Sequence, residues 1–196
     1  TRKMKDSGIE WIGEIPEEWE IVKLKSITKS HYSGGTPTAS KEEFYSEDNI
    51  KGFAFVNISD ITDQKYITST AKNITIKGIE NKNLKLVPKG SLLYAMYASV
   101  GKLSVSQIDL YISQAILAFD ATEKADKRYL VYYLNSLESF VDYFSSGTTQ
   151  MNLNAEIVKN FKVVIPSLKI QQKAIADFLD KKTQEIDNII SKTKKA

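Results

Sequence analysis

Apolar and charged residues alternate just after Pro16, over the segment Trp19–Leu24. This period of two predicts a half-buried β-strand. The turn formers of Ser33–Thr38 come next, with two glycines that permit unusual backbone angles and a proline that cannot continue a strand ladder. We expect an exposed loop there. Apolar runs at Phe53–Ile58 and within Ser91–Phe119 are rich in Val, Ile, Leu and Tyr, and they predict a mixed or antiparallel sheet.

A helical period follows over Asp126–Ser146, where Gly147 occupies the expected C-cap position. The apolar residues at this spacing are Leu130, Tyr133, Leu134, Leu137, Val141 and Phe144. We expect this helix to cover one face of the sheet, and we expect a further strand at Phe161–Ile165.

The final segment, after Pro166, has a second helical stripe that runs to the end of the chain. Its opposite face is charged, and a helix of about 28 residues would reach about 40 Å. An approximate heptad interrupted by Lys182 predicts that the apolar stripe is buried against a partner helix. The predicted interface residues are Leu168, Ile175, Leu179, Ile186, Ile189 and Ile190.

These elements predict an α+β fold in two parts. Residues 1–166 would form a globular domain with packed helices, and residues 167–196 would form a long amphipathic helix for dimerisation or spacing.

The composition is that of a folded globular protein, with 42% hydrophobic and 26% charged residues in 196. No apolar stretch approaches the roughly 20 residues of a membrane helix, and the absence of cysteine fits a reducing compartment. We expect a soluble cytoplasmic protein without an export signal. The net charge of +3 does not decide whether nucleic acid is a partner.

The motifs of common catalytic sites are absent from the sequence. There is no phosphate-binding loop, zinc-protease motif, dinucleotide fingerprint or adenine-methyltransferase motif. The single histidine, His31, excludes histidine-rich metal clusters, and Asp60 and Asp63 are typical of carboxylates that cap a turn. We therefore expect no catalytic residue, metal site or cofactor.

The polar segment Ser145–Asn154 gathers hydroxyl and amide side chains after the first predicted helix. Amides can pair bidentately with adenine. Polar side chains in loops also commonly bond to their own backbone, so both interpretations stay open.

Several segments together resemble the specificity subunit of type I restriction-modification systems, in order along almost the whole chain. Two of these have small departures: Val87–Leu93 has Ser91 where an aspartate is common, and Ile165–Asp180 has Ser167 for a frequent proline and Gln171 for a frequent glutamate. The other matching segments are Lys5–Glu20, Ser33–Pro37 and Gly147–Asn154.

This resemblance implies a target recognition domain that binds one half of a split site in double-stranded DNA. In the family two such domains are separated by two long helices packed as an antiparallel coiled coil. The chain holds one unit, so its helix would pair with a second copy or with the second half of a longer subunit. The implied protein partners are modification subunits, which bind S-adenosylmethionine and methylate adenine, and restriction subunits, which use ATP. None of that chemistry carries over to this chain.

Motifs shared by proteins of different specificity cannot determine sequence preference, so the matched motifs are predicted to serve the scaffold or subunit docking. They comprise Gly34, Gly35, Thr36, Pro37, Gly147, Thr148, Thr149, Gln150, Asn152 and Asn154. Base contacts are expected instead from the unmatched stretches between these motifs, particularly residues 40–51 and 63–83. Phosphate contacts are expected from the clustered lysines Lys72, Lys77, Lys82 and Lys85.

Two other classes of function remain open at this point. One is a protein-interaction adaptor that uses only its terminal helix. The other is a recognition domain detached from a fused restriction-methylation enzyme.

Overall fold

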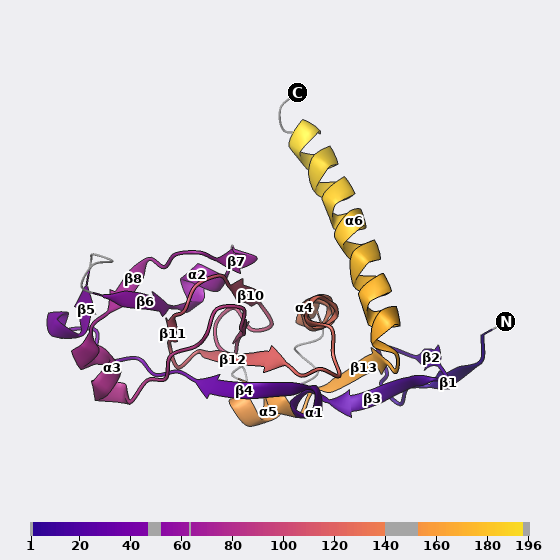
Figure 1. The fold of residues 1–196 in the computed structure, drawn as a ribbon, viewed down its shortest axis with the longest axis horizontal. Helices are drawn as coiled ribbons and strands as arrows, with labels where there is room; N and C mark the ends of the chain where they lie inside the picture. Colours follow the sequence, from indigo (N-terminus) through magenta and orange to yellow (C-terminus); the bar gives the residue numbers. More distant parts are fainter. Residues whose placement is uncertain (1, 47–51, 63, 140–152, 194–196) are drawn as a thin grey trace.

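A computed structural model describes residues 2–46, 52–62, 64–139 and 153–193 (Figure 1). Within these residues the strands form four sheets. Two are small and antiparallel: β1 (Met4–Asp6) with β2 (Glu14–Pro16), and β3 (Trp19–Lys23) with β13 (Lys162–Pro166). The predicted strands at Trp19–Leu24 and Phe161–Ile165 are therefore confirmed, and they pair with each other.

The central sheet has five strands in the order β4-β12-β9-β10-β7. Its parallel pair is β10 with β7, and its other pairs are antiparallel, so the sheet is mixed. The strands are β4 (Thr28–Ser33), β7 (Tyr66–Ile67), β9 (Leu92–Ala95), β10 (Leu103–Ser106) and β12 (Ile116–Ala121).

Strand β9 is apolar throughout because both of its faces are buried. Successive side chains alternate between the faces. Leu92 and Tyr94 belong to a core shared with helix α4, whereas Leu93 and Ala95 belong to a second core on the other side. The central sheet therefore separates two apolar layers.

Helix α4 (Lys127–Ser136) covers the first of these cores, as the sequence predicted. Asp126 caps it, since its carboxylate accepts hydrogen bonds from the backbone N–H groups of Arg128 (3.0 Å) and Tyr129 (3.2 Å). The α-helix ends at Ser136, earlier than predicted, and residues 137–139 continue it as a tighter 3₁₀ turn. The rest of the predicted helix, and Gly147, lie outside the described residues.

A second, four-stranded sheet lies at one end of the molecule, in the order β11-β6-β8-β5 (Figure 1). We call this sheet and its flanking helices η1 and α3 the distal lobe. Its elements are η1 (Glu42–Phe44), β5 (Tyr45–Ser46), β6 (Phe53–Val56), β8 (Lys72–Ile74), α3 (Ile76–Lys82) and β11 (Tyr111–Ile112). The short helix α2 (Ile58–Thr62) lies between this lobe and the central sheet.

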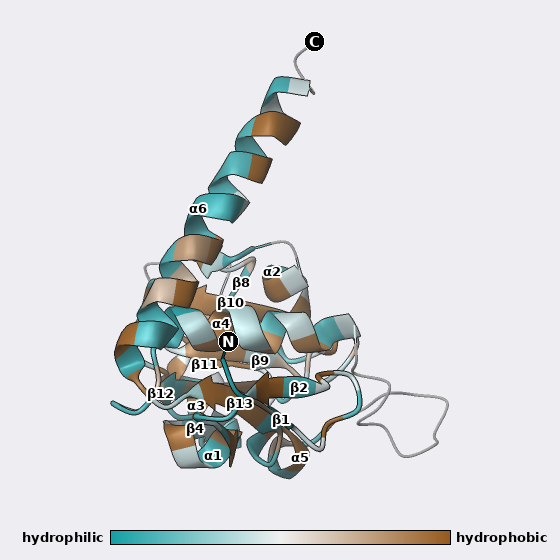
Figure 2. Ribbon diagram, turned by 90° about the vertical axis from the view of Figure 1, so that its right-hand side faces the viewer, coloured by the Kyte–Doolittle hydropathy of each residue, from teal (hydrophilic) through white to brown (hydrophobic). Residues whose placement is uncertain are grey.

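The last helix, α6 (Lys169–Thr193), rises from the other end of the molecule (Figure 1). Its base packs against α4 and β13, and apolar residues continue along its projecting part (Figure 2).

Two short helices, α1 (Leu24–Ile27) and α5 (Ala155–Lys159), pack together beneath the central sheet. The predicted α+β class with a long C-terminal helix is thus confirmed, although the strands form several sheets instead of one.

Candidate nucleic-acid interface

The two segments expected to contact bases, residues 40–51 and 63–83, meet in the distal lobe. Strand β5 belongs to residues 40–51 and strand β8 to residues 63–83, and these strands pair with Tyr45 opposite Ile74. The backbone of the same segments is further joined at Thr75, whose N–H and hydroxyl donate to the carbonyls of Phe44 (3.0 Å) and Glu43 (2.7 Å). Segments distant in sequence therefore form one continuous surface.

Helix α3 packs closely against η1 and strand β8 of this lobe. Thr75 caps its first turn by accepting a hydrogen bond from Gly78 N–H at 3.3 Å, and Asn83 ends it in the left-handed conformation with φ of 48°. A Cβ atom on Gly78 would lie 2.5 Å from the Phe44 carbonyl oxygen and 2.7 Å from Ile74 Cγ1. Only glycine permits this close approach, which fixes the helix on the sheet.

All four predicted phosphate-binding lysines are exposed on or beside the distal lobe. Lys72 lies on β8, Lys77 and Lys82 lie on α3, and Lys85 follows α3. Lys77 forms an ion pair with Glu43 at 2.9 Å. Within the part of the chain that the structure describes, Lys72, Lys82 and Lys85 form no ion pair.

The Lys77–Glu43 pair keeps both groups charged. The hydrogen bond and charge of Lys77 lower the pKa of the Glu43 carboxyl, and Glu43 raises the pKa of the Lys77 ammonium. Because both groups are exposed, the pair contributes little to stability. The positive charge of Lys77 is therefore partly neutralised by Glu43. Lys72, Lys82 and Lys85 have no carboxylate partner among the described residues.

A groove of about 660 Å³ opens between the two segments. Tyr45 lies in its wall and donates a hydrogen bond to the Pro37 carbonyl at 2.7 Å, and burial raises the pKa of its phenol. Sequence reasoning did not single out Tyr45, since one tyrosine among ten carries no signal of its position. The residues that line the groove are Ala39, Glu42, Tyr45, Ser46, Ala71 and Lys72.

The family-like loop at residues 34–37 is half-buried instead of exposed. Gly35 N–H donates to the Ile112 carbonyl at 3.2 Å, and Pro37 is buried. A Cβ atom on Gly34 would meet the carbonyl oxygens of Ile112 and Ser113 closer than 3.0 Å. Thr36 Oγ1 lies 3.5 Å from the Gln114 backbone nitrogen. The loop therefore docks against the strand β11 and the residues that follow it.

Substitution of Gly34 by alanine should destabilise the domain, because a methyl group there collides with backbone atoms that cannot rotate away. We expect the free energy of unfolding to fall by about 2 to 3 kcal/mol, measured by urea denaturation. Gly35→Ala is the matched control. Its added Cβ would lie 3.1 Å from Leu84 Cδ2 and 3.2 Å from Lys82 Cβ, contacts that a shift of a few tenths of an ångström relieves. Equal losses for the two variants would contradict this account.

The second family-like motif is only partly described. Gly147, Thr148, Thr149, Gln150 and Asn152 lie outside the described residues. Asn154 caps α5, since its Oδ1 accepts a hydrogen bond from the Ile157 N–H at 2.9 Å. The Asn154 side chain therefore forms its hydrogen bond with the backbone of its own segment.

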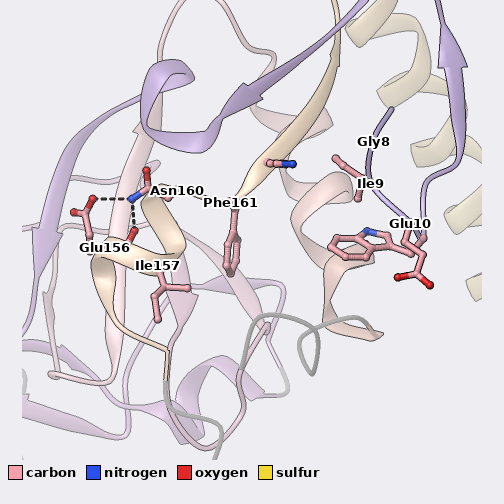
Figure 3. Close-up of a pocket in the computed structure, with 9 residues that line it drawn as sticks. Gly8, Ile9, Glu10, Glu156, Ile157, Asn160 and Phe161 are labelled. Atoms are coloured by element: carbon pink, nitrogen blue, oxygen red, sulfur yellow. Dashed lines mark hydrogen bonds between the residues drawn. The ribbon is translucent and has the colours of Figure 1, made fainter. Parts of the chain in front are cut away.

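The opening segment and α5 border a largely apolar hollow of about 530 Å³ (Figure 3). Ile9 lies on one side, and Ile157 and Phe161 lie on the other. Trp11 also lines the hollow. Both sides belong to or adjoin family-like motifs, and none of the residues that line the hollow belongs to the distal lobe.

The residues considered for catalysis or metal binding have structural partners. Both oxygens of the buried Asp60 carboxylate accept backbone N–H groups, from Asn57 (2.8 Å) and Ala71 (3.0 Å). His31 Nε2 lies 2.9 Å from Thr28 Oγ1, and burial lowers the pKa of its imidazole. Asp63 lies outside the described residues. Among those that are described, no three His, Cys, Asp or Glu side chains gather as metal ligands, and no helix could cross a bilayer.

The predicted interface of α6 divides into a covered and a bare part. Ile175 packs against the core of its own domain, and Leu179 is half-buried. The others are largely exposed: Leu168 (59%), Ile186 (56%), Ile189 (64%) and Ile190 (47%). The exposed part includes the outer half of the helix.

Comparison with known proteins defines the class. Residues 16–196 match the family described as the type I restriction modification DNA specificity domain, and the chain belongs to this family. It is 28% identical over 181 residues to the HindI specificity subunit of Haemophilus influenzae, and 31% identical over 191 residues to the MjaVIII specificity subunit of Methanocaldococcus jannaschii. These matches cover 89% and 91% of this chain but only 38% and 42% of the relatives.

Solved structures show the same fold. The HsdS subunit of Thermoanaerobacter tengcongensis superposes with a TM-score of 0.70 at 19% identity, over 94% of this chain and 41% of that one. The S subunit of M. genitalium gives a TM-score of 0.57 at 16% identity, over 88% of this chain and 41% of its own. The chain thus spans about two fifths of the length of the relatives that it matches.

Proposed function

We propose that this chain recognises one half of a bipartite double-stranded DNA target, as part of the specificity subunit of a type I restriction-modification complex. The observation that carries the proposal is the pairing of β5 with β8. It joins residues 40–51 and 63–83, the segments expected to contact bases, into one lobe. Lys72, Lys82 and Lys85 are exposed on or beside this lobe and form no ion pair with any described residue. Clustered lysines without carboxylate partners are the electrostatic feature that phosphate binding requires.

In this proposal the chain is not a catalyst and acts in the cytoplasm. Modification subunits would methylate adenine with S-adenosylmethionine, and restriction subunits would use ATP, at targets that this chain selects. The family-like segments around the hollow of Ile9, Trp11 and Phe161 are the proposed region for subunit docking.

Methyl transfer from labelled S-adenosylmethionine to DNA tests this division of labour. The purified chain alone should transfer no label, whereas the complete specificity subunit with its modification subunits should label DNA at one bipartite site. Label transfer by the highly purified chain alone would contradict the proposal.

We further propose that residues 1–166 form the recognition domain and that residues 167–196 form the spacer helix, which pairs with a second copy or with a second half-subunit. The exposed stripe of Ile186, Ile189 and Ile190 supports this, because a bare apolar helix face in water favours association.

The double variant Ile186→Asp, Ile189→Asp should shift the chain toward monomer, since burying unpaired carboxylates in a helix seam is costly. Sedimentation at tens of micromolar measures the shift. The control Gln184→Asp, Asn188→Asp adds the same charge on the opposite, polar face and should leave association unchanged. A monomeric unmodified chain would exclude self-pairing and leave pairing with a second half-subunit.

A further inference from the structure

The base of α6 is fastened to the domain by one buried amide side chain. Gln172 is 1% exposed, and its Oε1 accepts a hydrogen bond from Asp126 N–H at 2.7 Å. Its Nε2 donates to the carbonyls of Lys124 (3.1 Å) and Pro166 (2.9 Å). Because Asp126 also caps α4, this amide ties together the start of α4, the end of β13 and the first turn of α6.

A second set of contacts lies farther along α6. The guanidinium Nη1 of Arg128 lies 2.7 Å from Asp177 and 2.8 Å from Asp180. The Tyr132 hydroxyl donates to the other oxygen of Asp180 at 2.6 Å. The hydrogen bond from Tyr132 and the charge of Arg128 lower the pKa of the Asp180 carboxyl, so it is charged at neutral pH.

The same tyrosine also contacts Lys65, beside strand β7 of the central sheet and within residues 63–83. Lys65 Nζ lies 5.7 Å from the centre of the Tyr132 ring and 5.6 Å from that of Tyr66 on β7. A small cavity of about 170 Å³ lies between Lys65, Tyr66 and the polar contacts of Asp180. The α4–α6 contact is therefore continuous with residues 63–83.

Two attachments along one helix fix the direction of its axis. Gln172 and Asp180 are about 12 Å apart at 1.5 Å per residue, and about 20 Å of helix continues from Asp180 to Thr193. Nearly all side chains of that outer part are exposed. A tilt of about 10° at Gln172 would move the tip, about 32 Å away, by about 5.5 Å, which exceeds the 3.4 Å rise between successive base pairs of DNA.

We infer that Arg128 and Tyr132, acting through Asp177 and Asp180, are positioning residues that set the direction of α6 and thereby the spacer length that the assembled protein accepts between its half-sites. This inference rests on the proposed function. It assigns a specificity role to residues that lie on the domain side of the helix contact and away from the distal lobe.

The test is methylation by the complete complex of DNA substrates whose spacer differs by single base pairs. With the double variant Arg128→Gln, Tyr132→Phe, the preference for the wild-type spacer over neighbouring lengths should fall by about fivefold or more, in line with the coupling energies of contacting residues. Lys182→Gln is the control. It removes the same charge and breaks the 2.7 Å ion pair with Glu185, which lies within α6.

The outcomes separate the two claims. A wild-type complex without methylation at any bipartite site would overturn the proposed function and the inference with it. A wild-type complex with one preferred spacer, and a double variant whose methylation falls equally at all spacers, would overturn the inference alone. A loss of spacer preference in the double variant but not in Lys182→Gln supports it.

Discussion

Replacing Lys72, Lys82 and Lys85 by glutamine should weaken DNA binding by the complete complex on the order of a hundredfold near physiological salt. Each phosphate contact releases counterions, so the loss of three contacts should also flatten the plot of log affinity against log salt by about 3 in slope. Binding measured between about 50 and 200 mM salt gives both quantities. Lys77→Gln should have a smaller effect than any one of the three, because Lys77 is paired with Glu43.

The control replaces Lys23, Lys29 and Lys124 by glutamine. These lysines are exposed on β3, on β4 and shortly before α4, outside the distal lobe. The change in net charge is the same, so a general charge effect would weaken binding equally in both triple variants. Equal losses would contradict the placement of phosphate contacts on the distal lobe.

Gln172→Leu should lower the free energy of unfolding of the chain by at least about 2 kcal/mol. The variant leaves the Asp126 N–H and the Pro166 carbonyl buried without their partner, and each such group costs about 1 to 3 kcal/mol. The half-buried Lys124 carbonyl also loses a hydrogen bond. Urea denaturation followed by circular dichroism measures the loss.

Gln184→Leu is the matched control, because it makes the same substitution at an exposed position of the same helix. We expect its effect to stay within about 0.5 kcal/mol. If the two variants were equally stable, the buried amide would not be what holds the base of α6.

Local patterns in the sequence predicted the elements but not their pairing. The alternation in Trp19–Leu24 and the apolar run at Phe161–Ile165 each indicated a strand, because side-chain period depends only on neighbouring residues. That these strands pair with each other depends on contacts between opposite ends of the chain, which period cannot reveal. The same limit explains why one predicted sheet proved to be several.

The candidate site shows a similar division. The sequence identified the segments 40–51 and 63–83, because they lie outside the motifs shared with the family. It also identified the four lysines, because they are clustered along the chain. The pairing of Lys77 with Glu43 joins residues 34 positions apart and needed the fold. The burial of the loop at Gly34 likewise depends on the position of Ile112, so composition alone suggested an exposed turn.

Sequencing of methylated bases in cells with and without the gene that encodes this chain tests the central claim most directly. We predict that deletion removes adenine methylation at one bipartite motif, and that the intact gene restores it at the same motif. An unchanged pattern of adenine methylation after deletion, in cells whose modification subunits are expressed, would contradict the account.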